Sequence, residues 1–202
     1  MARDRKTNEE RRKATRQKIV QATLDLCAER GYHMVSPKDI SQEAGVSVGI
    51  LYHYFKNKRE IAIHLIETLG FALADQVEQG FYHAATYKAS VEQGYGMLFD
   101  YVEQNKAGFT ALIREFGNQE LKEHLDQVIE RLIMDSARRI GEQQGLGILR
   151  KDIHGEIAAR LVQDLAFSAV RLYLEGRFSR EDVLDVLIKI QAQGLEAGKP
   201  TS

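Results

Sequence analysis

The sequence predicts an all-α protein. Only 2 of its 202 residues are prolines, so few positions interrupt a helix. Apolar residues recur three and four positions apart through most of the chain, which is the period of an amphipathic helix. Serine, asparagine and glycine stand at the ends of several of these stretches, where helices need caps and stops. We therefore expect an N-terminal three-helix domain that a long helix joins to a C-terminal helical domain.

Composition limits the class of protein. Hydrophobic residues at 44% and charged residues at 28% are ordinary for a globular chain of one large or two small domains. The single cysteine, Cys27, excludes an internal disulfide framework, which suits a reducing cytoplasm. We expect its side chain to be buried inside the first helix. No apolar run approaches the ~18 residues of a membrane span, and the first residues lack a signal peptide. We expect a cytoplasmic protein with no membrane partner.

The net charge of −1 conceals an asymmetry. Residues 1–60 contain 13 Lys and Arg against 8 Asp and Glu, whereas residues 61–202 contain 15 against 21. A basic half is expected where one end of a protein approaches a polyanion, although charge alone is not specific.

Residues 1–14 are expected to form a flexible basic arm. The run from Met1 to Lys18 has eight basic and three acidic residues and no apolar periodicity before Ile19. Such an arm can lie along phosphates or in a minor groove, or it can be a solvated tail. The sequence leaves both interpretations open.

A helix is predicted from Thr15 to Arg30, with Gly31 ending it. Its apolar positions are spaced to face one side of the helix. These positions are Ile19, Ala22, Leu26 and Cys27. We expect this helix to brace the motif that follows, within a domain of residues 15–62.

The motif spans residues 36–55. Ser36 can cap a short helix whose first position is Pro37, and Gly45 can take the left-handed conformation that ends it. Ile40 and Ala44, four residues apart, form its predicted buried face.

A second short helix follows the turn at Gly45, with Ser47 as its cap. Its predicted inner face consists of Ile50, Leu51, Tyr54 and Phe55. Its predicted outer face consists of Val48, Gly49, Tyr52 and His53. Two helices with a glycine turn are the helix-turn-helix arrangement, whose second helix enters the DNA major groove. The alternative is that Tyr52 and His53 lie on a solvated surface or pack on a neighbouring helix.

The third helix of this domain is predicted to be long. Asn57 and Glu60 have the spacing of a capping box, and one apolar stripe continues to Gly80. From Asn57 to Gln79 it spans about 33 Å at 1.5 Å per residue. It would link the helix-turn-helix domain to the remainder of the chain.

Residues 63–202 are expected to form a helical domain for effector binding and dimerisation. Further helices are predicted at about 91–102, 109–116, 118–144, 152–175 and 179–195, with a loop at 81–89. The glycine-rich stretch 141–147 is predicted to be flexible and to separate the last two helices from the rest. Aromatic and long apolar residues in the first of these suit either a cavity for an apolar ligand or an ordinary core. The candidate effector-binding residues are Tyr95, Phe99, Phe109, Leu112, Phe116 and Leu132. Arg114 is either a partner for an acidic head group or a surface residue paired with Glu115 or Glu120.

The last two helices predict a homodimer. They are apolar, contain several alanines, and can pack closely against a second copy as a four-helix contact.

Signals of catalysis are weak. The six histidines show no paired metal-ligand spacing, and with one cysteine there is no zinc-ligand set. The chain contains no GxSxG, GxGxxG or Walker motif. We expect no metal, no cofactor and no enzymatic activity.

The run from Thr15 to Glu67, above all VSVGILYHYFKNKREI, resembles the DNA-binding domain of the TetR family of transcriptional regulators. The resemblance implies that Lys38, Val48, Gly49 and Tyr52 face base edges, and that Ser36, Tyr54, Lys56 and Lys58 face the DNA backbone. Ser47 and His53 complete the candidate DNA-binding set. Val48 and Pro37 depart from the polar residue and the threonine that are frequent in the family at these positions, so the operator sequence cannot be predicted.

The same resemblance implies a cytoplasmic homodimeric repressor that binds a roughly palindromic DNA operator and is released by a small apolar effector. The segment YVEQNKAGFTALIREFGN is similar to a stretch in TetR-family repressors of unsaturated fatty acid synthesis, which suggests a lipid-like effector. The alternative is a helical binding or signalling module of the same fold that does not read DNA sequence.

Overall fold

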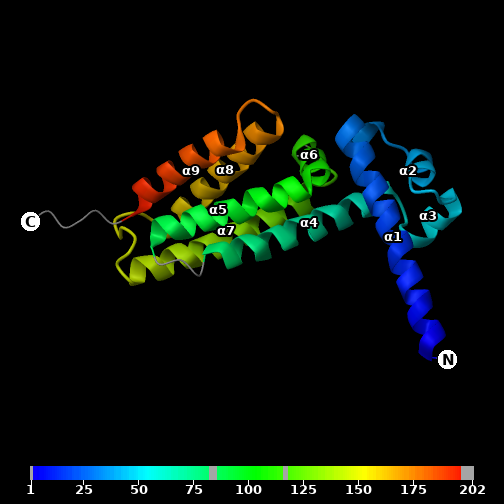
Figure 1. Ribbon diagram of the computed structural model, residues 1–202, viewed down its shortest axis with the longest axis horizontal. Helices are drawn as coiled ribbons and strands as arrows, with labels where there is room; N and C mark the ends of the chain where they lie inside the picture. The colour runs from blue at the N-terminus through cyan, green and yellow to red at the C-terminus, as the bar shows by residue number, and fades with distance from the viewer. Residues whose placement is uncertain (1, 82–85, 116–117, 197–202) are drawn as a thin grey trace, which may run out of the picture. The chain divides into compact units, whose positions relative to one another are not determined.

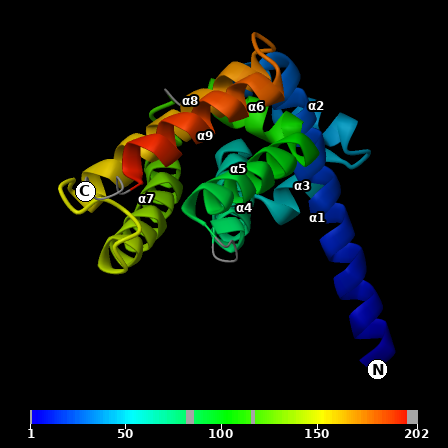
Figure 2. The same ribbon diagram turned by 60° about the vertical axis from the view of Figure 1, so that its left-hand side comes forward.

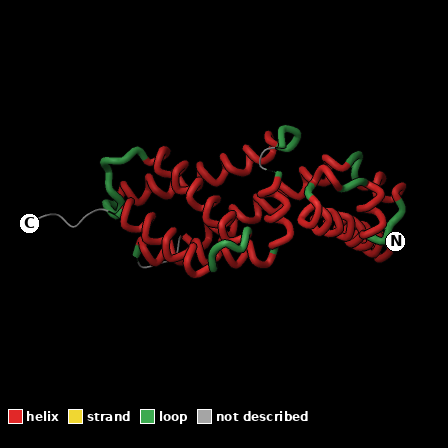
Figure 3. The backbone as a smooth tube through the Cα atoms, turned by 90° about the horizontal axis from the view of Figure 1, so that it is seen from above, coloured by secondary structure: helices red, strands yellow, loops and turns green. Residues whose placement is uncertain are grey.

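The structure is a computed structural model that describes residues 2–81, 86–115 and 118–196. The described residues are helical apart from short connections and one isolated bridge between Leu149 and Glu196, which confirms the all-α prediction (Figures 1 and 3). The elements in chain order are α1 (Ala2–Arg30), the 3₁₀ helix η1 (Tyr32–Met34), α2 (Pro37–Glu43), α3 (Val48–Tyr54), α4 (Lys58–Phe81), α5 (Tyr87–Gln104), α6 (Lys106–Arg114), α7 (Lys122–Gly145), α8 (Gly155–Leu174) and α9 (Arg180–Leu195). Within this described part of the chain, no helix is long and apolar enough to cross a membrane.

The chain divides into two compact units. Unit 1 contains residues Met1–Leu69 and Ala107–Leu125, and unit 2 contains Gly70–Lys106 and Asp126–Ser202. Residues 107–125 therefore pack with the N-terminal helices, although the sequence assigns them to a C-terminal domain. Helices α4 and α7 each contribute residues to both units.

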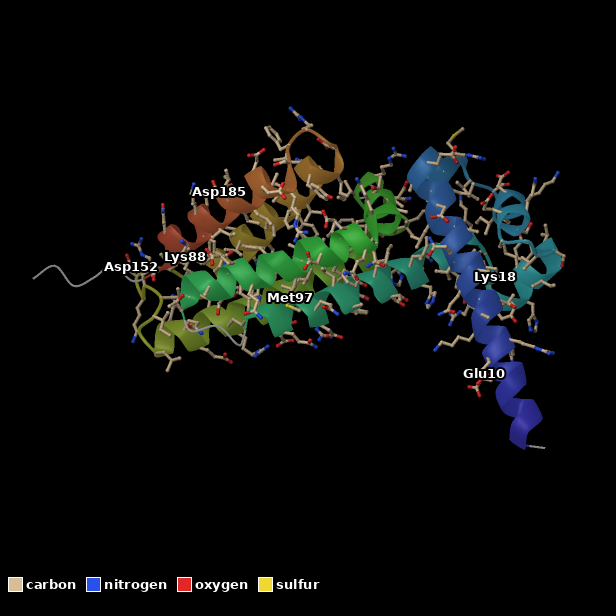
Figure 4. The ribbon with its side chains drawn as sticks, viewed as in Figure 1. Glu10, Lys18, Lys88, Met97, Asp152 and Asp185 are labelled. Carbon is tan, nitrogen blue, oxygen red and sulfur yellow. The ribbon has the colours of Figure 1, made fainter. Side chains whose placement is uncertain are left out.

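Helix α1 is longer than predicted. It begins at Ala2 and not at Thr15, so the flexible conformation expected for residues 1–14 is wrong for residues 2–14. These residues include arginine, lysine, glutamate and alanine, without glycine or proline, and they extend a helix that the buried residues from Ile19 onwards already nucleate. Its N-terminal turns extend past α2 and α3, and the side chains of Glu10 and Lys18 project from them (Figure 4).

Unit 1 has a core beneath the two short helices of the motif. Large side chains from four helices are fully buried there. The hydroxyl of Thr23, which is also buried, donates a hydrogen bond to the Ile19 carbonyl (2.8 Å). The buried residues include Ile19 of α1, Ile40 of α2, Leu51 of α3 and Ile61 of α4. This core holds α2 and α3 against α1 and the start of α4.

Unit 2 is held together by helix pairs. Helix α9 packs against both α5 and α8, and α8 and α9 lie side by side in both ribbon views (Figure 2). One buried cluster joins α7, α8 and the end of α9. It consists of Ile133, Ile140, Leu149, Ala158, Ala159, Val162 and Leu195.

Two stretches predicted to separate helices are shorter than expected. Helix α4 does not stop at Gly80 but continues to Phe81, and α5 begins at Tyr87 after the cap Thr86, whose hydroxyl accepts from the Ala89 N–H (3.2 Å). Residues 82–85 of that predicted loop lie outside the described residues. The stretch 141–147, predicted to be flexible, is helical up to Gly145, close to the helix end predicted at Gln144, because the intervening glutamate and glutamines favour a helix.

Gly80 and Gly94 allow α4 and α5 to approach closely. A Cβ atom on Gly80 would lie 2.8 Å from the Gly94 Cα, and a Cβ on Gly94 would overlap the Phe81 ring. Gly80 is therefore a packing residue and not a helix stop.

Substitution of Gly94 by alanine should destabilise the protein by about 1–3 kcal/mol, because the added methyl group overpacks the contact with Phe81. Urea denaturation measures the change in the free energy of unfolding. Gly96 in the same helix is the control, since nothing lies within 4 Å of the place that a Cβ atom would take there. Gly96→Ala should instead stabilise by about 0.5–1 kcal/mol through helix propensity. Equal effects of the two substitutions would show that α4 and α5 do not approach at these glycines.

Candidate nucleic-acid interface

The first helix of the motif is fixed by a capping box. The Ser36 hydroxyl accepts from the Asp39 N–H (3.2 Å), and the Ser36 N–H donates to the Asp39 carboxylate (2.8 Å). Hydrogen bonds from the Ser36 hydroxyl and N–H hold the pKa of Asp39 below its usual value. The predicted start of α2 at Pro37 is confirmed, and the cap leaves the Ser36 and Lys38 side chains exposed.

The turn between α2 and α3 depends on Gly45. Its φ angle of 65° lies in the left-handed region, as predicted, and the Val46 N–H donates to the Ser41 carbonyl (2.9 Å). Ser47 then caps α3, with its hydroxyl accepting from the Ile50 N–H (3.2 Å). The caps and the turn set the angle at which α3 leaves α2.

Helix α3 buries a narrower face than predicted. Leu51 is fully buried and the C-cap Phe55 is 1% exposed, but Ile50 is 44% exposed. The prediction that Ile50 faces inward is wrong, because a helix of two turns packs on the core through Leu51 and Phe55 alone. Tyr54 is half-buried and meets the His53 ring edge-on at 5.3 Å between centroids.

The outer face of α3 is open to solvent. Val48 is 38% exposed and Tyr52 is 48% exposed, and Gly49 and His53 are exposed as well. No acidic residue occurs between Gly45 and Lys58, so this face does not repel phosphate. Its exposed atoms are mainly apolar and aromatic, which suits contact with base edges such as a thymine methyl group.

Lys58 occupies a different position from the one predicted. Its ammonium group donates to the carbonyls of Tyr32 (2.8 Å) and Val35 (2.9 Å) and lies 4.1 Å from the centroid of the Tyr32 ring. This geometry corrects the prediction of a phosphate contact, because the ammonium group is bonded to backbone carbonyls of η1 and its C-cap inside the domain. Lys56, two residues earlier, has the exposed side chain that a phosphate contact requires.

Lys58→Met should lower the free energy of unfolding by about 1.5–3 kcal/mol, because two carbonyls lose a charged hydrogen-bond donor. Urea denaturation provides the measurement. Lys56→Met is the control, and its exposed side chain predicts a change within about 0.5 kcal/mol. A Lys58→Met protein as stable as the wild type would show that the bonds to Tyr32 and Val35 contribute nothing.

A basic residue of α1, Arg16, lies next to the end of α3, which the sequence did not indicate. The guanidinium of Arg16 lies 5.1 Å from the centroid of the Phe55 ring at the end of α3. Arg12 precedes Arg16 by one helical turn on the same face, and both are exposed. If the predicted helix had been extended from Thr15 towards the N-terminus, the four-residue spacing would have placed Arg12 and Arg16 on one face.

The candidate effector residues are divided between the two units. Tyr95, Phe99 and Leu132 are buried in unit 2, whereas Phe109 is buried and Leu112 is half-buried in unit 1. Phe116 lies outside the described residues.

The interior of unit 2 carries a chain of hydrogen bonds that the sequence did not indicate. The Tyr95 hydroxyl donates to the Gln191 amide oxygen, and the Gln191 amide N–H donates to the Tyr87 hydroxyl (3.0 Å). Burial raises the pKa of both tyrosines, that of Tyr87 to about 12, so both hydroxyls stay protonated.

A second polar group in unit 2 centres on Ser136. Its buried hydroxyl oxygen accepts from Arg139 (2.9 Å) and from the Gln163 amide (2.6 Å). The Arg139 guanidinium also lies 4.7 Å from the centroid of the Phe81 ring. This unit therefore combines an apolar core with buried polar groups that bond to one another.

Arg114 is used within unit 1. Its guanidinium donates to the carbonyls of Ala28 (2.5 Å) and Glu29 (3.3 Å) in the last turn of α1. Arg114 is exposed, as expected for a surface residue, and its guanidinium satisfies free carbonyls at the C-terminal end of α1, where a cation is favoured.

Residues 19–65 match the family model described as "Bacterial regulatory proteins, tetR family", over the segment that builds this surface. The chain belongs to the TetR family. It is a DNA-binding transcriptional regulator.

Relatives of this TetR-family chain include two curated regulators. The "Fatty acid metabolism regulator protein" of Bacillus subtilis is 27% identical over 156 residues, which cover 75% of this chain and 77% of that protein. The "HTH-type transcriptional repressor KstR2" of Rhodococcus jostii is 28% identical over 175 residues, covering 80% of each.

Solved structures share the fold. The fatty acid degradation regulator FadR of Bacillus halodurans has a TM-score of 0.81 at 18% identity, covering 89% of this chain and 95% of that one. FadR of Bacillus subtilis in complex with stearoyl-CoA has a TM-score of 0.72 at 18% identity, covering 88% of this chain and 98% of that one. These likenesses confirm the TetR-type fold.

Proposed function

We propose that this TetR-family chain is a cytoplasmic homodimeric repressor that binds a roughly palindromic operator and releases it when a long-chain acyl effector binds unit 2. The observation that carries the proposal is the exposed, acid-free face of α3 on a buried base of Leu51 and Phe55. The relatives that regulate fatty acid metabolism support the effector class.

On the DNA side, α3 lies in the major groove. Val48, Gly49 and Tyr52 face base edges together with Lys38. Gly49 lets the helix approach the bases closely because it has no side chain. The remaining members of the contact set face the sugar-phosphate backbone or flank the helix. They are Ser36, Ser47, His53, Tyr54 and Lys56.

The basic face of α1 adds to this surface. Arg12 and Arg16 are exposed on the side of α1 where Arg16 meets Phe55 at the end of α3. Such side chains contact phosphates flanking the bases that α3 reads, and each contact adds to the salt dependence of binding.

The homodimer forms through α8 and α9. Ile157, Leu161 and Leu165 repeat every four residues along α8 and are 57%, 59% and 37% exposed. Val186 and Ile190 form a similar exposed pair on α9, at 55% and 49%. An apolar surface on two adjacent helices is buried when a second copy packs on it as a four-helix contact.

The effector is a long acyl chain with a polar end. The apolar core of unit 2 suits the chain, and the polar groups at Ser136 and Tyr95 suit the end. Because DNA and effector favour different arrangements of the dimer, each lowers the affinity for the other by the same factor.

A mobility-shift assay with the DNA upstream of the chain's own gene tests both parts. We expect a salt-sensitive, sequence-specific shift that stearoyl-CoA reverses. Sequence-blind binding alone would favour a helical module that does not read DNA. A specific shift that stearoyl-CoA leaves intact would refute the effector class and retain the regulator.

A further inference from the structure

The 3₁₀ helix η1 connects α1 to the helix-turn-helix motif. It spans only Tyr32–Met34, and Val35 alone separates it from the Ser36 cap of α2. Gly31 enters it with a φ angle of 83°. The position of this single turn therefore decides where α2, and with it α3, is held relative to α1.

An acidic side chain from a distant part of the sequence holds the N-terminal end of η1. The carboxylate of Glu115, 8% exposed, accepts from the Tyr32 N–H (3.0 Å) and from the Asn118 side-chain amide (2.8 Å). His33 Nε2 lies 3.9 Å from the same carboxylate. An anion is favoured there because the first N–H groups of a helix point outwards without partners.

A basic side chain binds the carbonyl groups of the same turn. Lys58, the first residue of α4, donates to the carbonyls of Tyr32, the first residue of η1, and of Val35, its C-cap. The turn is thus clamped between two side chains that come from different helices or their flanks.

Glu115 is also connected to unit 2 along the chain. It directly follows α6, which a single residue, Asn105, separates from α5 of unit 2. Downstream of Asn118, α7 begins in unit 1 and continues into unit 2. Two further hydrogen bonds fasten this segment inside unit 1, from Arg114 to the Ala28 carbonyl and from Arg59 to the Glu120 carbonyl (3.1 Å).

We propose that Glu115 is the positioning residue that couples effector binding to DNA release. With the carboxylate on the Tyr32 N–H, η1 holds α2 and α3 in the arrangement that fits the operator. Movement of α5 or α7 upon effector binding displaces Glu115 and frees η1. The inference rests on the effector-released DNA binding proposed above and names the contact through which it acts.

The test compares Glu115→Ala and the near-isosteric Glu115→Gln with the control Glu123→Gln, which removes an exposed carboxylate from the first turn of α7. Operator affinity is measured by mobility shift with and without stearoyl-CoA, and thermal unfolding checks the fold of each protein. We expect Glu115→Ala to weaken operator binding about tenfold or more without effector, in line with the loss of a charge-assisted hydrogen bond. Glu115→Gln retains an acceptor without the charge and should lose less, and Glu123→Gln should match the wild type.

The ratio of operator affinity without stearoyl-CoA to operator affinity with it distinguishes a loss of effector response from a general weakening of the DNA-binding domain. This ratio should fall to about one in Glu115→Ala, where η1 is already released, and less far in Glu115→Gln, which retains an acceptor. An unchanged operator affinity in both variants, or a weakened affinity with the wild-type ratio, would overturn the proposal. Failure of stearoyl-CoA to release the wild type would count instead against the effector class, and it is recognised separately because the wild-type measurement does not involve Glu115.

Discussion

Leu161→Arg should convert the protein to a monomer and abolish operator binding at concentrations where the wild type binds. Leu161 is 59% exposed in the single chain, in the middle of the apolar stripe on α8. In a symmetric dimer the substitution buries two unpaired charges, which costs several kcal/mol and raises the dissociation constant of the dimer at least about a thousandfold. Sedimentation velocity and the mobility shift measure the two effects.

Leu146→Arg is the matched control for this experiment. Leu146 is 73% exposed and follows the end of α7, outside the stripe formed by α8 and α9. The variant should remain dimeric and bind the operator. A dimeric Leu161→Arg protein would show that the apolar stripe serves another contact.

Tyr52→Ala should reduce specific operator binding by about 1–3 kcal/mol per half-site and leave binding to random DNA nearly unchanged. Tyr52 is exposed at the centre of the α3 surface and is not part of its buried face, so the substitution removes a base contact without opening the core. Because a dimer presents the residue to two half-sites, the loss counts twice. Competition mobility shifts with operator and random duplexes measure both affinities.

Lys56→Ala is the companion variant, because the exposed Lys56 side chain faces phosphate in our proposal. It should weaken binding to all DNA alike and reduce the slope of log affinity against log salt concentration by about 1. Equal losses of specific and random binding in Tyr52→Ala would show that Tyr52 does not read bases.

Local signals predicted the motif well because they act between residues close in sequence. The Ser36 and Ser47 caps each bond an N–H three residues ahead, and the left-handed turn at Gly45 needs only the absence of a side chain. The stripe in α8 was likewise visible as a four-residue repeat. The sequence did not show that this stripe is exposed in the single chain, since an apolar repeat does not reveal which residues cover it.

The predictions that failed depended on surroundings beyond local sequence. Ile50 has the same apolar spacing as Leu51, and only the narrow contact of α3 with the core leaves it exposed. Lys58 was predicted to face the DNA backbone because the resemblance to the TetR family implies that contact at its position. Carbonyls more than twenty residues away take up its hydrogen bonds instead.

The sequence by itself determined the helices, their caps and the family, because periodicity, capping and the glycine turn are each encoded within a few neighbouring residues. Only the tertiary structure decided which charged groups hold the motif. Glu115 and the Tyr32 N–H are 83 residues apart, and no local pattern marks that a buried carboxylate is needed at the first turn of η1. The physical reason is that a hydrogen bond between distant segments exists only after the chain has folded and brought donor and acceptor within 3 Å.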